Sequence, residues 1–505
     1  MAQIQTPGVY IVEKNAFPNS VVEVATAVPV FIGFTQQASY QGNSLFNQAV
    51  KISSLVDYQT YFGGAAQIQY KLTAQKASAP GYIGLNGTYY SVDVVPATLY
   101  YMYNMVRMYF ENNGGPCYIY SIGAYGTAPA LSNFTDALTA LENEPDPTIV
   151  IAPDALLLSN NDYNTYMQTV LPHCQKMQSR VAVLDVYGGA VTSPLNVDTA
   201  IQGFRNGVGI NGLNYAAAYF PWGNTTVVQS NEVSFVNLQI TDFTPYLEVT
   251  DPNLGPVITQ VLTNVTAAQK AYSTITPATS AAVLQQVQQA HQGLLTASPN
   301  YTNMITSVLA QINTLPMAGA MAGVYAYVDS TRGVWKAPAN VSLTGVVSPT
   351  VNLNDDQQAN LNVDPSTGKS VNVIRFFSGQ GVLVWGARTL DGNSQDWRYV
   401  SVRRTLIMIE QSVKLAARAY VFEPNDANTW STVKSMIGNF LNNLWKQGAL
   451  AGTKPDDAYT VQVGLGSTMT ADDILNGFMN ITVLVAVTHP AEFIVITFQQ
   501  QMQKS

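Results

Sequence analysis

The sequence predicts a multidomain protein that combines α/β and α+β architecture, and three observations lead to this fold class. Its 505 residues, 47% of them hydrophobic, are enough for two to four domains with more than one core. Strand-like and helix-like stretches alternate over residues 100–220, which is typical of an α/β layer with a mostly parallel sheet. The last part of the chain instead reads as two long helices followed by strands, which is typical of an α+β domain.

The chain opens with the strand-like segment TPGVYIVE, residues 6–13, which follows a Pro-Gly break. Its side chains alternate between two faces, the period-2 pattern of a β-strand. A strand at a chain end has no local hairpin partner, yet its N–H and C=O groups must be satisfied. A second extended run covers Ser20–Thr35. The residues of the opening strand are Gly8, Val9, Tyr10, Ile11, Val12 and Glu13.

The alternating pattern occupies the first half of the chain. Val50–Gly64 reads as a short strand, a helical turn capped by a serine and a glycine stop. Apolar residues at helical spacing over Tyr101–Tyr109 precede the turn NNGGP and the strand CYIYSI. Two further helices, FTDALTALEN and YNTYMQTVLPHCQKMQ, alternate with the strands PTIVIAPD and RVAVLDV. The strand Leu213–Trp222 ends this run.

The pattern changes between about residues 256 and 314, where three apolar stripes recur at helical spacing. They predict three amphipathic helices, which we interpret as an inserted helical subdomain. The polar stretch Ser348–Ser370 then bridges the two halves of the chain. The stripes are Val257, Ile258, Val261, Leu262 and Val265; Val283, Leu284, Val287, Ala290 and Leu294; and Tyr301, Met304, Ile305, Val308, Leu309 and Ile312.

The C-terminal region has the clearest pattern. One helix is predicted over Leu406–Tyr420, before Pro424, and a second over residues 428–448, with Gly448 as its stop. Three strands follow, DAYTVQVG, NITVLVAV and EFIVITFQ. The last of these contains Glu492, Phe493, Ile494, Val495 and Ile496.

Charged residues are unusually scarce. Asp, Glu, Lys and Arg make up 11% of the chain, where about 25% is ordinary, and 28 Tyr and many uncharged polar residues replace them. Free monomers keep surface charge for solubility, whereas interfaces lose charge and gain Tyr because desolvating an unpaired ion is costly. The composition therefore indicates a subunit that functions in an assembly.

Composition also bears on partners and location. The net charge of −8 gives no basic footprint for nucleic acid, and two cysteines, Cys117 and Cys174, allow at most one disulfide. The N-terminus lacks a basic region followed by an apolar run, so we expect no Sec-type signal peptide. Apolar stretches such as Ile481–Val487 are too short to span a bilayer. We therefore expect a protein made in the cytoplasm, without direct membrane insertion or nucleic-acid binding.

Two cofactor motifs fail on inspection. GVGING, with Gly207, Gly209 and Gly212, fits a dinucleotide-binding pattern, but a helix precedes it and a strand follows, the reverse of the required order. TGKS, Thr367–Ser370, resembles the end of a P-loop, but Val363 occupies the position of the required glycine. We expect a turn, an exposed Lys369 and no cofactor.

Catalytic and metal-binding candidates are equally weak. His173 adjoins Cys174 on a predicted helix, where neighbouring side chains point apart and cannot share a metal. His291 and His489 have no carboxylate or nucleophile placed in the sequence to suggest a triad, although triads assemble spatially. The sequence thus predicts no catalytic residue, no metal site and no enzyme.

One charge bias remains. The segment Arg398–Lys446 has seven basic residues and three acidic ones in an acidic chain. Ordinary solvated helix surfaces account for this as well as a basic surface for an acidic partner does. The basic residues are Arg398, Arg403, Arg404, Lys414, Arg418, Lys434 and Lys446.

An ordered set of segments resembles the contractile tail sheath family, which includes the sheaths of contractile phages, tailocins and extracellular contractile injection systems. The segments are TPGVYIVE, VATAVPVFIGFT, YFGG, FENNGGPCYIY, AAAYFPW, MAGAMAGVYAYVDSTRGVWKAPAN, RYVSVRRTLIMIEQSVKLAARAYVFEPNDANTWSTVKSMIGNFLNNLWKQGALAG and HPAEFIVITFQ. They cover most of the chain outside about residues 225–315 and 348–372. The inserted helices are where the chain departs from shorter relatives.

The resemblance implies a non-enzymatic structural protein that assembles as stacked hexameric rings around an inner tube. It implies a subtilisin-like α/β central domain without usable catalytic residues, and a conserved inner α+β domain. Terminal arms, here Gly8–Glu13 and Glu492–Phe498, would add strands to the sheets of neighbouring subunits. Basic helices would face the tube, with candidates Arg403, Arg404, Lys414, Arg418, Lys434 and Lys446. Baseplate and terminator or cap proteins would be further partners, in a particle that is released or membrane-anchored.

We expect a division into five regions. Residues 1–27 form the N-terminal arm and strand, 28–99 a small β-rich domain and 100–347 the central α/β domain with the helical insertion at about 225–315. Residues 348–395 form a polar connector with strands, and 396–505 form the inner domain with the C-terminal arm. Two alternatives to a sheath remain open: an α/β hydrolase-like enzyme without a recognisable motif, and another structural array protein.

Overall fold

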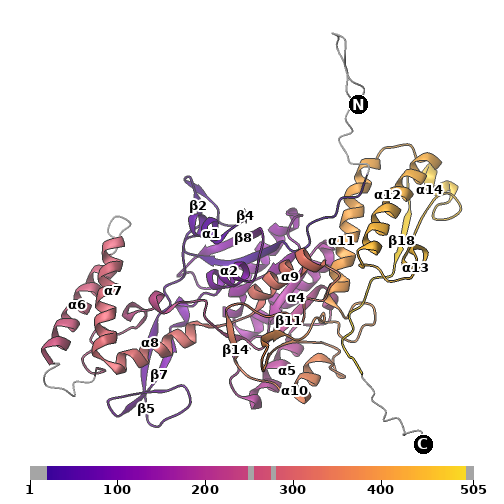
Figure 1. Cartoon of the computed structure of the whole chain (residues 1–505). Coiled ribbons are helices and arrows are strands. Elements are labelled where there is room, and N and C mark those ends of the chain that lie inside the picture. The colour runs from indigo at the N-terminus through magenta and orange to yellow at the C-terminus, as the bar shows by residue number, and fades with distance from the viewer. Residues whose placement is uncertain (1–19, 248–254, 275–279, 496–505) are drawn as a thin grey trace, which may run out of the picture. The chain divides into compact units, whose positions relative to one another are not determined.

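The computed structural model of the protein (Figure 1) describes residues 20–247, 255–274 and 280–495. The chain divides into two compact units, residues 26–403 and, in its described part, residues 20–25 with 404–495. The boundary falls within one helix, α11. The helices are α1 (Leu55–Phe62), α2 (Met102–Glu111), α3 (Leu131–Ala140), α4 (Asn160–Met177), α5 (Val197–Gly207), α6 (Gly255–Ser273), α7 (Ser280–Ala297), α8 (Pro299–Ile312), α9 (Ala318–Arg332), α10 (Asp355–Asn362), α11 (Val400–Ala417), α12 (Ala427–Lys446), α13 (Pro455–Ala458) and α14 (Ala471–Leu475).

The strands form one large sheet and several small ones. The large sheet of the 26–403 unit has the order β16-β15-β11-β10-β9-β1-β8-β4. Its strands are β1 (Pro29–Thr35), β4 (Ala49–Ile52), β8 (Cys117–Ala124), β9 (Ile149–Ile151), β10 (Val181–Asp185), β11 (Ala216–Phe220), β15 (Asn372–Phe377) and β16 (Gly381–Val384). The small-sheet strands are β2 (Ser39–Tyr40), β3 (Asn43–Ser44), β5 (Tyr70–Gln75), β6 (Ile83–Leu85), β7 (Thr88–Val94), β12 (Gly223–Thr225), β13 (Thr314–Leu315), β14 (Val346–Pro349), β17 (Tyr459–Val463) and β18 (Ile481–Val485).

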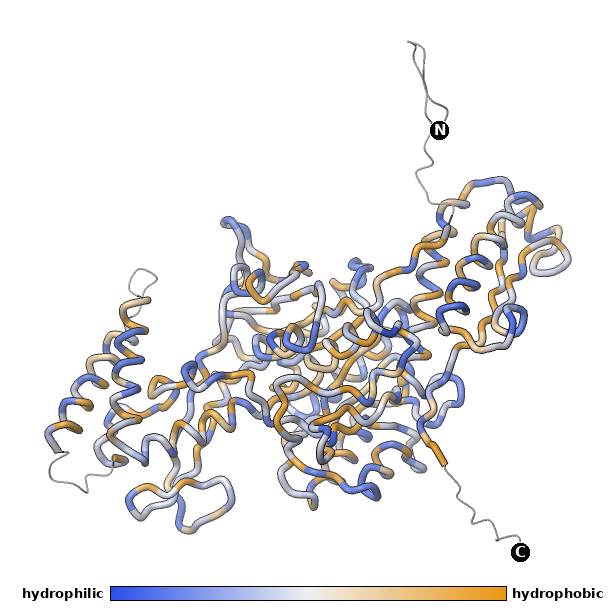
Figure 2. The backbone as a smooth tube through the Cα atoms, in the orientation of Figure 1, coloured by the Kyte–Doolittle hydropathy of each residue, from blue (hydrophilic) through white to orange (hydrophobic). Residues whose placement is uncertain are grey.

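The large sheet confirms the predicted α/β layer. Its six inner strands pair in parallel, and the two edge strands, β4 and β16, pair antiparallel. All seven residues of β1 are buried, as are all residues of β9, β10 and β11, which is why these segments are continuous apolar runs. Apolar residues accordingly concentrate in this region of the chain trace (Figure 2).

The position of β1 differs from the domain division expected from the sequence, which placed it in a small domain over residues 28–99. β1 lies between β8 and β9 in the middle of the large sheet. Segment 28–99 is therefore divided, because its first strand belongs to the central layer. Pairing between strands so distant in the sequence leaves no local signature for a sequence-based division to use.

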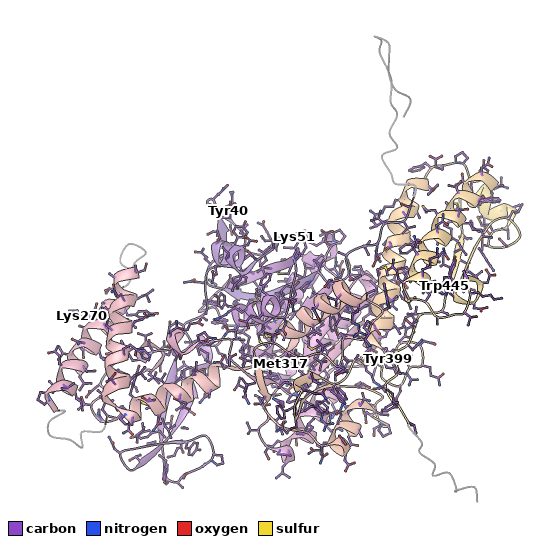
Figure 3. The ribbon with its side chains drawn as sticks, in the orientation of Figure 1. Tyr40, Lys51, Lys270, Met317, Tyr399 and Trp445 are labelled. Atoms are coloured by element: carbon purple, nitrogen blue, oxygen red, sulfur yellow. The ribbon has the colours of Figure 1, made fainter. Side chains whose placement is uncertain are left out.

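Helices α2 and α9 pack closely against each other at this sheet. Two glycines of α9 make the approach possible: a Cβ on Gly319 would lie 2.4 Å from Met105 O, and one on Gly323 would lie 2.7 Å from Tyr109 O. Met317, the residue before α9, is fully buried at the centre of the unit (Figure 3).

A second hydrophobic core joins two stretches that the sequence analysis assigned to different domains. We call residues 66–99 and 228–312 the helix–hairpin module. Their buried side chains, from Ile68 and Tyr70 to Tyr301 and Val308, form one cluster in which α6, α7 and α8 share a core with β5, β6 and β7. The three helices lie where they were predicted, and α6 and α7 stand beside each other with alternating hydropathy (Figures 1 and 2).

Hydrogen bonds lock the two stretches of the module together. Gln69 Nε2 donates to Val236 O at 2.7 Å, and Asn237 Nδ2 donates to Ile68 O at 3.0 Å. Gln311 Nε2 donates to Val92 O at 2.6 Å, and Asn300 Nδ2 donates to Asn86 Oδ1 at 2.9 Å. The helices are therefore not a free-standing insertion, because the hairpin completes their core.

Several local predictions are confirmed. Ser54 caps α1 by accepting from Asp57 N, and Gly63 ends it with φ 81°. GVGING lies between the end of α5 and β11, with Gly209 and Gly212 at positive φ, so it forms a turn as expected.

The prediction that the Lys369 side chain is exposed is wrong. Lys369 is buried, not exposed, and its Nζ donates to Arg205 O at 2.5 Å. The buried carboxylate of Asp364, 3.6 Å from Arg205 Nε, supplies the compensating charge. Arg205 Nε also donates to Lys369 O. The TGKS loop is therefore buried and hydrogen-bonded to α5, which connects this helix to the segment before β15.

Candidate assembly site

The 404–495 part of the chain confirms the two long helices and the first two of the three strands predicted to follow them, whereas the described part of the third, Glu492–Val495, forms no strand. Asp426 caps α12 by accepting from Asn428 N and Thr429 N, and α12 packs on β17 through its apolar face. The core residues of this face are Val433, Met436, Ile437, Phe440, Leu441 and Leu444. Val461 of β17 and Ala458, the last residue of α13, are buried as well.

Strands β17 and β18 form an antiparallel pair in full register, from Tyr459 opposite Val485 to Val463 opposite Ile481. Within the described part of the chain they pair only with each other, so the sheet has unpaired edges. Leu484 on β18 is 59% exposed. An open edge with an apolar strand is a template for another extended segment.

The chain leaves this sheet with an exposed apolar segment. Phe493, Ile494 and Val495 are 71%, 79% and 88% exposed, and residues 491–495 form no strand. Contiguous exposed apolar side chains of this kind mark interaction sites in soluble proteins. Of the predicted arms, Gly8–Glu13 and Ile496–Phe498 lie outside the described residues.

The predicted basic residues separate into two groups. Lys414 and Arg418 lie four residues apart at the end of α11 and in the following turn, and Lys434 and Lys446 lie on α12; all four are exposed. Side chains four apart on a helix share one face, so Lys414 and Arg418 form a local basic pair.

Arg403 and Arg404 are instead each 4% exposed. The Arg403 guanidinium lies 4.4 Å from the centre of the Trp397 ring and 4.6 Å from that of Tyr215, within the 26–403 unit. Arginine is suited to such stacking because its charge is delocalised over a plane. Arg403 therefore stacks on rings of its own chain, and neither arginine lies on the exposed surface of a single copy.

The three histidines occupy unrelated positions. Burial lowers the pKa of His173 to about 4, so its ring is neutral at pH 7. His291 Nδ1 lies 2.7 Å from Tyr301 Oη in the core of the helix–hairpin module, and His489 Nδ1 lies 3.0 Å from Val487 O. Among the residues that the structure describes, no cluster of three or more metal-ligating side chains is present.

Two buried carboxylates are features that the sequence analysis missed. Asp154 Oδ2 accepts from Phe34 N at 2.8 Å and its Oδ1 from Tyr101 N at 2.6 Å, which ties the end of β1 to the start of α2. Asp185 accepts from Met317 N at 2.6 Å and Ala318 N at 3.1 Å, at the start of α9. Burial raises the pKa of Asp154 to about 6 and that of Asp185 to about 7. The signal available in the sequence was an Asp at or just after the end of a buried strand.

Two known domain families match consecutive parts of the chain, over residues 127–390 and 393–501. Residues 127–390 match the phage tail sheath protein central domain, and residues 393–501 match the phage tail sheath C-terminal domain. The chain belongs to the phage tail sheath family. Within the described residues of this sheath protein, no helix is long and apolar enough to cross a membrane.

Curated relatives match part of the sheath protein. It is 29% identical over 142 residues to the tail sheath protein of Vibrio phage KVP40, covering 27% of this chain and 20% of that protein. It is 28% identical over 144 residues to the tail sheath protein of Burkholderia phage BcepMu, covering 28% of this chain and 30% of the relative. The matched segments therefore span less than a third of these relatives.

Solved structures match over the full length. The sheath of the extracellular contractile injection system PVC in its contracted state is 28% identical, covers 99% of both chains and has a TM-score of 0.59. The helical sheath of the anti-feeding prophage in its contracted state is 27% identical, covers 99% of this chain and 100% of the other, and has a TM-score of 0.58. The mixed α/β fold of the sheath protein is thus the fold of contractile sheaths.

Proposed function

We propose that this protein is the structural sheath subunit of a contractile injection machine, a phage tail or a tail-like particle. Copies polymerise as stacked hexameric rings around an inner tube in a metastable extended state, and contraction drives the tube through a target envelope. The observation that carries the proposal is the full-length likeness to two contractile sheaths. No catalytic role is proposed, since the relatives are sheath proteins and the histidines lie apart.

The open-edged sheet of the C-terminal unit supports a strand-addition mechanism. The N–H and C=O groups at the open edges of β17 and β18 can form hydrogen bonds with an added strand. The apolar side chains of Phe493–Val495 are exposed to water in a single copy. If the arms, Gly8–Glu13 and Glu492–Phe498, each extend the sheet of a neighbouring copy, every contact joins two different surfaces. Repeated contacts of that kind generate a helical assembly rather than a closed dimer.

Contraction requires two stable arrangements of the same interfaces. The subunits rotate as rigid bodies while the strand links hold, and energy stored at assembly is released when packed interfaces change state. The basic surface of Lys414, Arg418, Lys434 and Lys446 would face an acidic inner tube, with complementarity setting register and assembly rate. Baseplate and cap proteins would bind the ends of the stack, and no nucleic acid is contacted.

Deletion of residues 1–14 tests the proposal. Negative-stain microscopy of the full chain should show striated hollow cylinders when the cognate tube is present. The deletion variant should remain folded, with an unchanged circular dichroism spectrum, and form no cylinders. A matched control that deletes residues 77–80, in the exposed loop between β5 and β6, should still form them. Cylinders formed by the arm deletion would overturn the arm mechanism, and discrete monomers of the full chain would overturn the proposed function.

A further inference from the structure

A cavity of about 310 Å³ lies within the 26–403 unit, where the helix–hairpin module meets the carboxyl end of the large sheet. Ile68 and Tyr70 come from the module, Tyr101 and Asn104 from the start of α2, and Trp222 from the segment after β11. Ligands of α/β proteins bind outside the carboxyl ends of the strands, and pockets of roughly 300–1,000 Å³ hold small molecules. The position and the size are therefore those of a ligand site.

Four aromatic side chains line the cavity, Tyr70, Tyr100, Tyr101 and Trp222, and contacts with one another and with the surrounding backbone hold them in place. Tyr101 and Trp222 meet edge to face, with ring centres 5.5 Å apart. Trp222 Nε1 donates to Val186 O at 3.2 Å, and Tyr100 Oη donates to Thr127 O at 3.0 Å. Tyr70 is 1% exposed. The aromatic surfaces are therefore fixed before any ligand arrives, which lowers the entropic cost of binding.

One polar group without a partner belongs to the same lining. Asn104 is 4% exposed, and its Oδ1 bonds to no group among the described residues. Buried polar groups are nearly always hydrogen-bonded, and leaving one unpaired costs about 1–3 kcal/mol. A ligand N–H or O–H group that enters the cavity and donates to Asn104 would recover that cost.

The lining residues include no Asp, Glu, Lys, Arg or His. A charged ligand would lose its hydration without gaining a counter-ion, which is strongly unfavourable. Aromatic walls with amide and hydroxyl groups suit an uncharged ring that carries a hydrogen-bonding group.

We propose that this aromatic cavity binds a small, uncharged aromatic molecule with an N–H or O–H group. The exposed residues Ala190 and Thr192 lie at its rim, on the segment after β10. The ligand would join the helix–hairpin module to the central sheet, a role separate from sheath assembly.

Fluorine NMR with 5-fluoroindole tests the proposal on the full chain. We expect saturable broadening of the ligand resonance, reversed by unlabelled indole but not by benzoate, whose charge the cavity excludes, or by glucose. Ala190→Trp, which places a ring at the rim, should weaken binding by about tenfold or more. Leu195→Trp is the matched control: Leu195 is 89% exposed on the same segment and does not line the cavity, so affinity should be unchanged.

A second variant tests the polar contacts. Asn104→Leu should weaken 5-fluoroindole binding while raising or preserving the melting temperature, since it removes the buried Oδ1 that has no hydrogen-bond partner among the described residues. Absence of saturable binding to the wild-type chain would overturn the proposal and indicate a cavity filled by water. Binding by glucose instead of indole would overturn the ligand class, and equal binding by Ala190→Trp and wild type would overturn the location.

Discussion

At the scale of single residues, the unusual feature of the protein is that several charged side chains are buried. Arg403, between the rings of Tyr215 and Trp397, was predicted from the sequence to face the tube. The sequence shows that Arg403 is charged, but it does not show that the ring of Tyr215 covers it, because Tyr215 is remote along the chain. Lys369 was predicted to be exposed for the same reason: the acceptor of its Nζ, Arg205 O, lies far away in sequence.

Arg403→Met should lower the stability of the protein by about 2 kcal/mol, because a desolvated cation–aromatic contact is lost while the volume is nearly kept. Differential scanning calorimetry of the full chain would show the shift in melting temperature. Arg418→Met is the control, since Arg418 is exposed and should leave the melting temperature within error. Equal shifts for the two variants would contradict the structural role of Arg403.

Asp185 should make the stability of the 26–403 unit depend on pH. Burial raises its pKa from an ordinary value near 4 to about 7, so the folded state binds more protons than the unfolded chain between these values. The contribution of Asp185 to stability is therefore present at acidic pH and lost as pH rises through 7. His173, with its pKa lowered to about 4, acts in the opposite direction below pH 6.5.

Melting temperatures measured from pH 5 to pH 8 should isolate this effect when wild type is compared with Asp185→Asn. The wild-type curve should fall more steeply with rising pH than the variant curve, and the difference should level off above about pH 7.5. His173 and Asp154 contribute equally to both curves and cancel. Parallel curves would show that Asp185 does not titrate in this range.

At the scale of elements, the sequence predicted most helices and strands because their signals are local. Ser54 and Gly63 delimit α1, and the apolar stripes of α6, α7 and α8 mark their buried faces. The pairing of strands and the sharing of cores were harder to predict from the sequence. Neither the place of β1 beside β8 and β9 nor the sharing of one core by residues 66–99 and 228–312 has a local signature. Both depend on contacts between segments separated by many residues.

Packing of α2 on α9 gives a test at this scale. Gly319→Ala and Gly323→Ala should each destabilise the protein by about 1–3 kcal/mol, since the added Cβ would meet backbone oxygen atoms of α2 at 2.4 and 2.7 Å. Gly203→Ala in α5 is the matched control. A Cβ there meets nothing within 4 Å, so the higher helix propensity of Ala should leave stability equal or raised by up to about 1 kcal/mol. Thermal melts of the three variants check the ranking.

At the scale of the whole molecule, the sequence predicted the family and two candidate surfaces. Of the six basic residues predicted to face the tube, four are exposed, Lys414, Arg418, Lys434 and Lys446, and the proposed tube contact is limited to these. The arms stay a prediction, with Phe493–Val495 as their described and exposed portion. The sequence pattern alone did not distinguish the buried Arg403 and Arg404 of α11 from the exposed Arg418 that follows this helix.

Reversal of the charge on the exposed basic residues should weaken co-assembly with the tube. Lys414→Glu combined with Arg418→Glu should reduce the yield of tube-filled cylinders, and raising the salt concentration should produce a similar loss in the wild type. Lys270→Glu, an exposed reversal on α6 of the helix–hairpin module (Figure 3), is the control and should assemble normally. Sedimentation followed by electron microscopy measures both. Unimpaired co-assembly by the double reversal would exclude this surface as the tube contact.

The shared core of the helix–hairpin module constrains how sheath proteins of this type diversify. Recombination that exchanged only residues 228–312 would leave Ile68, Tyr70, Leu85 and Val92 without their packing partners. The two stretches must therefore be inherited as a linked pair, although more than a hundred residues of the central layer separate them. Chimeras with other sheaths should be built by grafting both stretches together, and a reporter domain is best inserted in a single exposed loop of one stretch.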